Sequence, residues 1–191
     1  MRAGEMVERH EAGAPNWHAI FTRHQHEKAV ASALSGKGHE IYLPLYLSVR
    51  KWQDRAKQLW LPLFPGYVFV REGMDRQFQI VTTPGVIHVV GWGGRPAVVP
   101  QSQLNAVRQI VESCLPVEAH PYLECGERVR VKAGPLAGLE GILTRKKGTA
   151  RLVVSMEMLG RSAAVEVDIF NVERIRPYAV PMIARGISAT A

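Results

Sequence analysis

"LPLFPGYVFV", residues 61–70, is the stretch that decides how this chain folds. It reads as a β-strand that is interrupted by two prolines. Because successive side chains of a strand point to opposite faces, Tyr67 and Phe69 face one way, and the valines that follow each of them face the other. Both faces are therefore apolar. Each face must be covered, either by helices of the same chain or by another molecule.

The composition is that of a folded protein. The chain has 191 residues, of which 47% are hydrophobic and 21% charged, and this balance suits one or two globular domains. No run reaches the roughly 20 apolar residues that a membrane helix needs, and the first residues lack the apolar region of a secretory signal. We therefore expect a cytoplasmic protein that does not contact membranes. The net charge of +7 favours a polyanionic neighbour.

The residues that carry chemistry in enzymes do not form a recognisable set. Cys114 and Cys125 lack the spacing of metal ligands, and His18, His24 and His26 have no carboxylate or cysteine at a known spacing to complete a site. The glycine series "GPLAGLEG" lacks the order of a phosphate-binding loop, and no GxSxG, HExxH or paired-carboxylate signature is present. We expect no enzyme activity, no metal and no cofactor.

The chain divides into two parts. The periodicity breaks at residues 113–122, "SCLPVEAHPY", which we interpret as a linker. Residues 16–112 follow the order β-α-β-β-α-β-α, which predicts an α+β fold, an antiparallel sheet with packed helices. Residues 123–178 contain short alternating strands and glycine turns, which predict a small five-stranded β-barrel. Residues 1–15 and 179–191 lack such patterns, and we expect mobile tails.

The N-terminal part is expected to contain a hairpin. Two strand-like segments flank the charged stretch "RKWQDRAK", residues 50–57. The expected elements are strands at 16–23, 39–49, 57–70 and 86–92, and helices at 24–38, 75–81 and around 104–111.

The order of five motifs carries a resemblance. "NWHAIFTR", "LFPGYVFV", "TTPGV", "GERVRVKAGPLAGLEGIL" and "LGRSAAVEVD" resemble the NusG family of transcription elongation factors, over roughly residues 16–178. "PLFPGYVFV" with "GRPAVVP" is similar to the specialised RfaH-like antiterminators of polysaccharide operons. The resemblance implies an NGN domain followed by an SH3-like KOW domain. It also implies a non-catalytic monomer that rides on RNA polymerase and recruits a further partner, such as a ribosomal protein or Rho, through the KOW domain.

The resemblance implies a role for the aromatic strand. In the family, an apolar pocket on the NGN domain receives the clamp helices of the largest catalytic subunit of RNA polymerase. The residues that match its lining are Phe21, Phe64, Pro65, Tyr67 and Phe69. Large rigid side chains suit the centre of an interface. The alternative is that the aromatic residues among these belong to an ordinary core. We expect the KOW domain to tumble separately and to leave the pocket open.

The hairpin connection is a candidate nucleic-acid contact. Basic side chains around an aromatic one can neutralise phosphates and stack on an unpaired base. The resemblance implies that the partner is upstream or non-template DNA. The alternative is a solvated hairpin tip. The residues concerned are Arg50, Lys51, Trp52, Arg55 and Lys57.

Two smaller sites complete the set of candidates. Thr82 and Thr83 precede "PGV", where some relatives contact non-template DNA, and they are alternatively residues that end a helix or form a turn. Leu159 and Arg161 lie at the tip "MEMLGRS", where NusG proteins often carry an exposed aromatic that meets a partner. We therefore expect them to form the partner surface of the KOW domain.

Two functions follow from these patterns. The first is a transcription elongation and antitermination factor that is bound to RNA polymerase and specific to particular operons. The second is a ribosome-binding or RNA-binding KOW protein that does not act on polymerase. The aromatic pocket separates them, because RNA binding does not require it.

Overall fold

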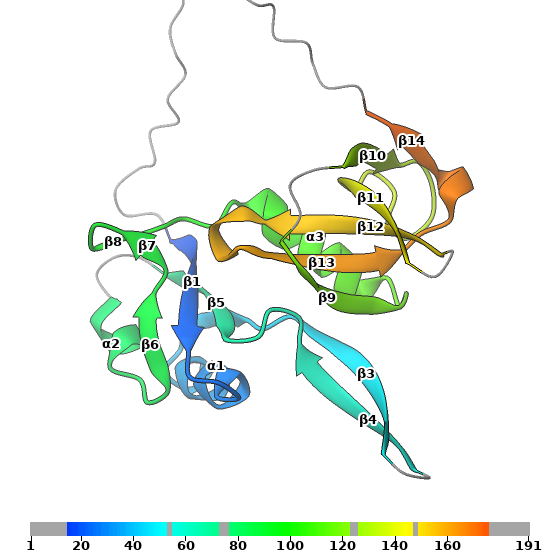
Figure 1. The fold of residues 1–191 in the computed structure, drawn as a ribbon. Coiled ribbons are helices and arrows are strands. Elements are labelled where there is room, and N and C mark those ends of the chain that lie inside the picture. The colour runs from blue at the N-terminus through cyan, green and yellow to red at the C-terminus, as the bar shows by residue number, and fades with distance from the viewer. Residues whose placement is uncertain (1–14, 53–54, 73–76, 123–125, 147–148, 176–191) are drawn as a thin grey trace, which may run out of the picture.

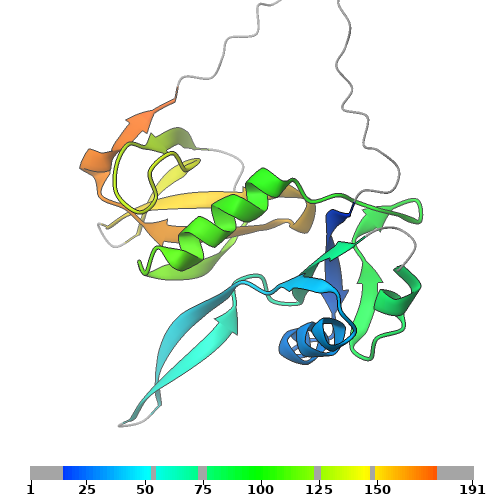
Figure 2. The same ribbon diagram turned by 180° about the vertical axis from the view of Figure 1, so that it is seen from behind.

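The fold consists mainly of two antiparallel sheets, with one helix that connects the first sheet to the second along the chain. The computed structural model describes residues 15–52, 55–72, 77–122, 126–146 and 149–175. An N-terminal sheet of four strands and a C-terminal sheet of six strands are linked by helix α3 (Gln101–Glu112), which Figure 2 shows lying across the C-terminal sheet. The mixed α+β prediction is confirmed. The expected tails lie outside the described residues, apart from Pro15.

The N-terminal sheet is built around the stretch at 61–70. Its strand order is β2-β5-β1-β6, and all pairs are antiparallel (Figure 1). The register sets Phe21 opposite Tyr67 and Ala19 opposite Phe69, so large aromatic side chains share one face of the sheet. The strands are β1 (Asn16–Thr22), β2 (Glu40–Tyr42), β5 (Tyr67–Glu72) and β6 (Val86–Val89).

Helices α1 (Glu27–Gly36) and α2 (Gln77–Val81) cover the valine face of this sheet. Val30 and Leu34 of α1, which are fully buried, belong to one apolar cluster with Ile20, Val68, Val70 and Ile80. The helical spacing in the sequence predicts this contact, because residues four apart share one helix face. One apolar face of residues 61–70 is therefore covered by the chain's own helices.

The two long strands expected from the sequence are each divided. Pro44 separates β2 from β3 (Leu45–Trp52), and a turn at Phe64–Tyr67 separates β4 (Arg55–Pro62) from β5. β3 and β4 form the predicted hairpin, which projects from the rest of the chain in both ribbon views (Figures 1 and 2). A second small hairpin, β7 (Gly91–Trp92) and β8 (Arg95–Pro96), follows β6.

The Phe64–Tyr67 turn is held from three sides. Gly66 has φ of +86°, and the Tyr67 N–H donates to the Phe64 carbonyl at 3.1 Å, which together with proline at the second position describes a type II turn. The Gly66 N–H donates to Glu27 Oε1 at 2.7 Å, and the Gly66 carbonyl accepts from the Thr22 N–H at 2.8 Å. The buried carboxylate of α1 therefore fixes the turn that positions β5.

The C-terminal sheet has one strand more than expected. Its order is β14-β10-β11-β12-β13-β9. The sixth strand is β9, which comes from the expected linker at 113–122 and pairs with β13. An alternating pattern is hard to see in β9 because two of its five residues are polar and one is proline. The strands are β9 (Val117–Pro121), β10 (Glu127–Val131), β11 (Glu140–Lys146), β12 (Thr149–Met156), β13 (Arg161–Glu166) and β14 (Val172–Arg174), with 3-10 helices η2 (Glu157–Leu159) and η3 (Ile169–Asn171).

The two parts of the chain share one core. A single apolar cluster joins the aromatic face of the N-terminal sheet, the buried side of α3 and the C-terminal sheet. In addition, Gln109 Nε2 of α3 donates to the carbonyls of Pro135 and Ala137, each at 3.1 Å. The expectation of a C-terminal domain that stands clear of the N-terminal pocket does not hold in this structure. The cluster includes Trp17, Ala19, Phe64, Phe69, Leu104, Val107, Ile110, Val129, Leu152, Val154, Met156 and Val165.

The Glu27–Gly66 hydrogen bond makes a testable contribution to stability. Glu27→Ala leaves the buried N–H without an acceptor, and we expect the free energy of unfolding to fall by about 1–3 kcal/mol. Glu27→Gln keeps an amide oxygen at the same place and is expected to lose less. Urea unfolding of the two variants and the parent chain measures the difference. Equal stability of all three proteins would contradict this role for Glu27.

Candidate functional site

Four side chains form an accessible aromatic patch at one end of the N-terminal sheet. Phe21 and Tyr67 are half-buried, and their ring centroids lie 5.2 Å apart. His88 of β6 is exposed, and its ring centroid lies 5.3 Å from that of Phe21. Pro65 is exposed at the turn. We call Phe21, Pro65, Tyr67 and His88 the aromatic patch. The sequence pattern did not point to His88. It lies opposite Phe21 where β1 pairs with β6, and it adds a third ring to the patch.

Phe64 and Phe69 lie beneath this patch, in the core. They are 1% and 0% exposed, and their rings meet edge to face at 6.1 Å. Phe69 also stacks on Tyr42 at 6.1 Å. Of the five residues predicted to line a pocket, these two therefore support the surface from within, as the core interpretation expects.

Arg108 of α3 is held between two aromatic rings of the N-terminal sheet. Its guanidinium carbon lies 4.9 Å from the ring centroid of Tyr42 and 5.3 Å from that of Trp17. Such cation–π contacts are strong when they are shielded from water. Burial raises the pKa of the Tyr42 hydroxyl, so this hydroxyl stays neutral, and it has no hydrogen-bond partner among the described residues. The contact fixes α3 to the aromatic face.

The predicted C-terminal partner surface lies next to the aromatic patch. A small pocket of about 190 Å³ has Leu63 and Pro65 on one side and strands β9 and β13 on the other, with the exposed Arg161 among its residues. Leu159 is 6% exposed and belongs to the shared core, so its side chain is not available to a partner in this arrangement. The sequence pattern did not point to two exposed apolar residues of η3 in the described C-terminal part, Ile169 and Phe170, which are 38% and 83% exposed.

The basic residues of the hairpin are brought together by its register. Arg50 lies opposite Lys57, and Trp52 lies opposite Arg55. Both pairs lie at the end of the hairpin where β3 connects to β4. At the other end, Lys28 of α1 donates to the carbonyl of Trp60 at 2.7 Å, which ties the hairpin to the helix. The backbone therefore collects the predicted cationic residues at one tip.

Thr82 and Thr83 end helix α2. The Thr82 hydroxyl donates to the Phe78 carbonyl and the Thr83 hydroxyl to the Gln79 carbonyl, both at 2.8 Å. Thr83 is buried, and its hydroxyl accepts from Lys37 Nζ at 2.7 Å. This is the arrangement that the capping interpretation predicts, and it leaves only Thr82 of the pair exposed.

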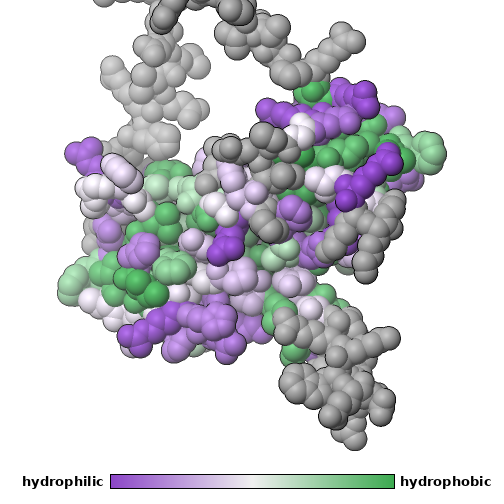
Figure 3. Space-filling view, in the orientation of Figure 1, coloured by the Kyte–Doolittle hydropathy of each residue, from purple (hydrophilic) through white to green (hydrophobic). Residues whose placement is uncertain are grey.

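Exposed apolar side chains also gather outside the aromatic patch. Figure 3 shows an apolar surface over α2 and β6, where Phe78, Val81 and Ile87 are 74%, 40% and 51% exposed. Within the described ranges, no group of three or more His, Cys, Asp or Glu residues is arranged to hold a metal ion. None of the helices in those ranges is long and apolar enough to cross a membrane.

These features define a class of protein that works by binding: an aromatic patch on a rigid sheet, a cationic hairpin, and a second sheet packed against the first. Comparison with known proteins gives the family. The protein-family model described as "Transcription termination factor nusG" matches residues 15–108. The transcription termination/antitermination protein NusG of Staphylococcus carnosus (strain TM300) is 30% identical over 183 residues, covering 86% of this chain and 98% of that protein. Its counterpart from Staphylococcus aureus (strain Mu50 / ATCC 700699) is 29% identical over 183 residues, with the same coverage.

The chain therefore belongs to the NusG family of transcription termination and antitermination factors, which are not enzymes. A solved structure described as "Domain interaction in Thermotoga maritima NusG" is similar with a TM-score of 0.52 and 22% identity, covering 85% of this chain and 98% of that one, and it supports the same fold. The relatives named here are NusG proteins and lend no support to the finer resemblance to RfaH-like antiterminators.

Proposed function

We propose that this protein is a cytoplasmic transcription elongation factor that binds RNA polymerase as a monomer through its aromatic patch. The observation that carries the proposal is the packing of Phe21 against Tyr67 on two paired strands, with the exposed Pro65 beside them. Rigid aromatic side chains that rest on a packed core lose little entropy on binding, and such residues dominate interface energies. The tip of the clamp helices of the largest catalytic subunit is the proposed ligand. Phe64 and Phe69 hold the patch in shape from below.

The C-terminal part recruits the second partner in this proposal. Arg161 and the apolar tip at Leu159 are the proposed contact for a ribosomal protein or for Rho. Pro65 and Arg161 line the same small pocket, and Leu159 is buried in the shared core while the two sheets stay packed together. Polymerase binding and partner recruitment are therefore coupled, since a ligand that favours the separated arrangement uncovers Leu159. We also propose that the strands of the C-terminal sheet form the small barrel that the sequence predicts.

The choice between general and operon-specific action rests on different observations. The relatives named above favour general termination and antitermination activity. The operon-specific alternative rests on the "PLFPGYVFV" and "GRPAVVP" segments of the sequence. The second candidate function, a ribosome-binding or RNA-binding KOW protein, would make the aromatic patch irrelevant. Polymerase binding separates these two candidates.

Truncating Tyr67 tests the proposed polymerase contact. We expect Tyr67→Ala to weaken binding to core RNA polymerase by about 2 kcal/mol, or about 30-fold, as for other central aromatic residues of interfaces. Phe78→Ala is the matched control, because Phe78 is an exposed aromatic outside the patch. Fluorescence anisotropy measures the affinities, and thermal melts verify the folds. Phe69→Ala is unsuitable, since loss of a buried phenylalanine typically lowers stability by about 3–5 kcal/mol.

Wild-type affinity of a folded Tyr67→Ala variant would reject the aromatic patch as the polymerase site. An equal loss in Phe78→Ala would show that any exposed aromatic matters equally, which would also contradict the assignment.

We further propose that the basic hairpin contacts upstream or non-template DNA in the transcription complex. The register that collects Arg50, Lys57 and Arg55 at one tip supports this role, because closely spaced cations release counterions from a phosphate backbone. Thr82, which is exposed at the end of α2, is a secondary candidate for the same ligand.

Replacing Arg50, Lys51, Arg55 and Lys57 with Ser tests the DNA contact. The slope of log affinity against log salt concentration for complexes with a long upstream duplex should flatten by about 1 for each phosphate contact that is lost. A control with the same change in charge removes four exposed cations elsewhere: Arg23, Arg95, Lys132 and Arg145. Identical slopes for the hairpin variant and its control would show that only net charge acts, and would refute the hairpin as a DNA contact.

A further inference from the structure

Strand β9 lies at the edge of the C-terminal sheet that faces the N-terminal part (Figure 1). Ala119 of β9 lines the small pocket whose other side is formed by Leu63 and Pro65. β9 is also the first strand after α3, and it pairs with β13 along its whole length. The position of β9 therefore decides where the C-terminal sheet is attached to the N-terminal part.

The connection between α3 and β9 is short and tied down. While β9 is paired, only residues 113–116 separate it from the end of α3, and they span at most about 14 Å. The Ser113 hydroxyl donates to the Ile110 carbonyl at 2.7 Å and accepts from the Leu115 N–H at 3.3 Å. If β9 leaves the sheet, residues 113–126 connect α3 to β10 and can span up to about 50 Å. Release of β9 alone therefore greatly lengthens the connection.

The pairing of β9 is reinforced by one charged contact. β9 is an edge strand that ends in proline, which has no N–H to donate to the sheet. Arg151 of β12 reaches across β13 and donates to Glu118 of β9, and it also donates to Glu166 of β13 at 3.3 Å. The Arg151 side chain is only 14% exposed, so water and salt screen this contact less than a surface pair. The ion pair of Glu118 with Arg151 thus holds β9 in the sheet.

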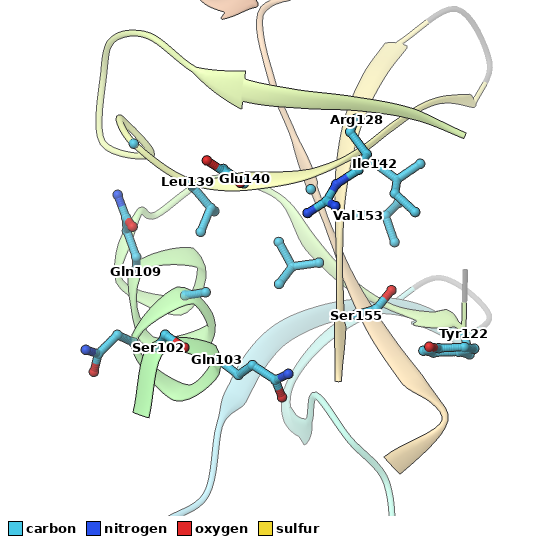
Figure 4. A pocket seen from close by; sticks show the side chains of 15 residues that line it. Ser102, Gln103, Gln109, Tyr122, Arg128, Leu139, Glu140, Ile142, Val153 and Ser155 are labelled. Atoms are coloured by element: carbon cyan, nitrogen blue, oxygen red, sulfur yellow. The ribbon is translucent and has the colours of Figure 1, made fainter. Parts of the chain in front are cut away.

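Two features of the packed arrangement favour its opening. Arg151 Nε and Gln103 Oε1 of α3 are both buried without a hydrogen-bond partner among the described residues, and opening would return such atoms to water. A cleft of about 690 Å³ also lies between α3 and the C-terminal sheet (Figure 4), so the two do not pack closely over that area. The packed arrangement therefore gains from a short connection, which keeps the two parts at a high effective concentration.

We propose that β9 is a detachable strap and that the ion pair of Glu118 with Arg151 is its latch. The latched strap holds the C-terminal sheet next to α3. Once the strap is released, the longer connection lowers the effective concentration of the two sheets, and they separate. The strap supplies the step that the coupling of polymerase binding and partner recruitment needs, and to that extent it rests on the proposed function. Its tests need no polymerase, so a failure of the strap leaves the Tyr67 contact with polymerase untouched.

Hydrogen exchange of the full chain, followed by mass spectrometry, measures release of the strap. Glu118→Gln keeps the shape of the side chain and removes its charge, and it should speed exchange in β9 about tenfold while exchange in β12 stays unchanged. Glu166→Gln is the matched control, because it removes the partner of Arg151 on β13 and none on β9. Raising NaCl from about 0.05 M to about 0.5 M should speed exchange in β9 more in the parent chain than in Glu118→Gln.

Labelling of a thiol at position 159 measures separation of the sheets, because Leu159 is 6% exposed and belongs to the shared core. Leu159→Cys is introduced together with Cys114→Ser and Cys125→Ser, and the rate of reaction with Ellman's reagent is followed. Circular dichroism verifies the fold of each variant. Adding Glu118→Gln should raise the labelling rate about tenfold, while adding Glu166→Gln should leave it unchanged.

Three results would overturn the strap: unchanged exchange of β9 in Glu118→Gln, equal acceleration in Glu118→Gln and Glu166→Gln, or faster exchange of β9 without faster labelling at position 159. Either of the first two rejects the latch. The third shows that β9 does not control separation of the sheets.

Discussion

The packing of α3 between the aromatic face of the N-terminal sheet and the C-terminal sheet is the contact on which the rest of the structure depends. Its buried residues Leu104, Val107 and Ile110 belong to the one cluster that reaches both sheets. Arg108 adds a guanidinium sandwiched by Trp17 and Tyr42 on one side, and Gln109 adds two hydrogen bonds to carbonyls of the C-terminal part on the other. Two residues beyond the end of α3, Cys114 adopts φ of +57°, which costs a non-glycine residue about 1–2 kcal/mol.

The division of the N-terminal sheet into two faces explains how one short strand serves both fold and binding. Val68 and Val70 are buried against α1, and Phe69 is buried in the core beneath α3. Tyr67 is only half-buried and lies at the edge of the packed region. The turn at Gly66 fixes that edge, because its N–H is bound by a buried carboxylate and an added Cβ would come within 3.0 Å of the Phe21 ring. The patch is thus rigid before any ligand arrives, which lowers the entropy lost on binding.

Sequence patterns predicted what depends on local periodicity. The alternation in residues 67–70, the helical face of Leu104, Val107 and Ile110, and the hairpin all follow from periods of 2 and 3.6. The pattern could not show which aromatics would be buried, because Phe69 and Tyr67 share a face and differ only in what packs over them. Glu27 and His88 were missed for the same reason, since their roles come from contacts with Gly66 and Phe21, which lie far away in the sequence. Strand β9 was read as a linker because its pairing with β13, and not its composition, makes it a strand.

Relaxation of backbone ¹⁵N nuclei in the full chain tests the shared core most directly. Amides of β1 and β5 report on the N-terminal sheet, and those of β12 and β13 on the C-terminal sheet. If α3 holds both in one cluster, all four strands will show a single rotational correlation time, that of a compact particle of 21.2 kDa. Two distinct and shorter correlation times, one for each sheet, would contradict the shared core and the coupling of the two surfaces that follows from it.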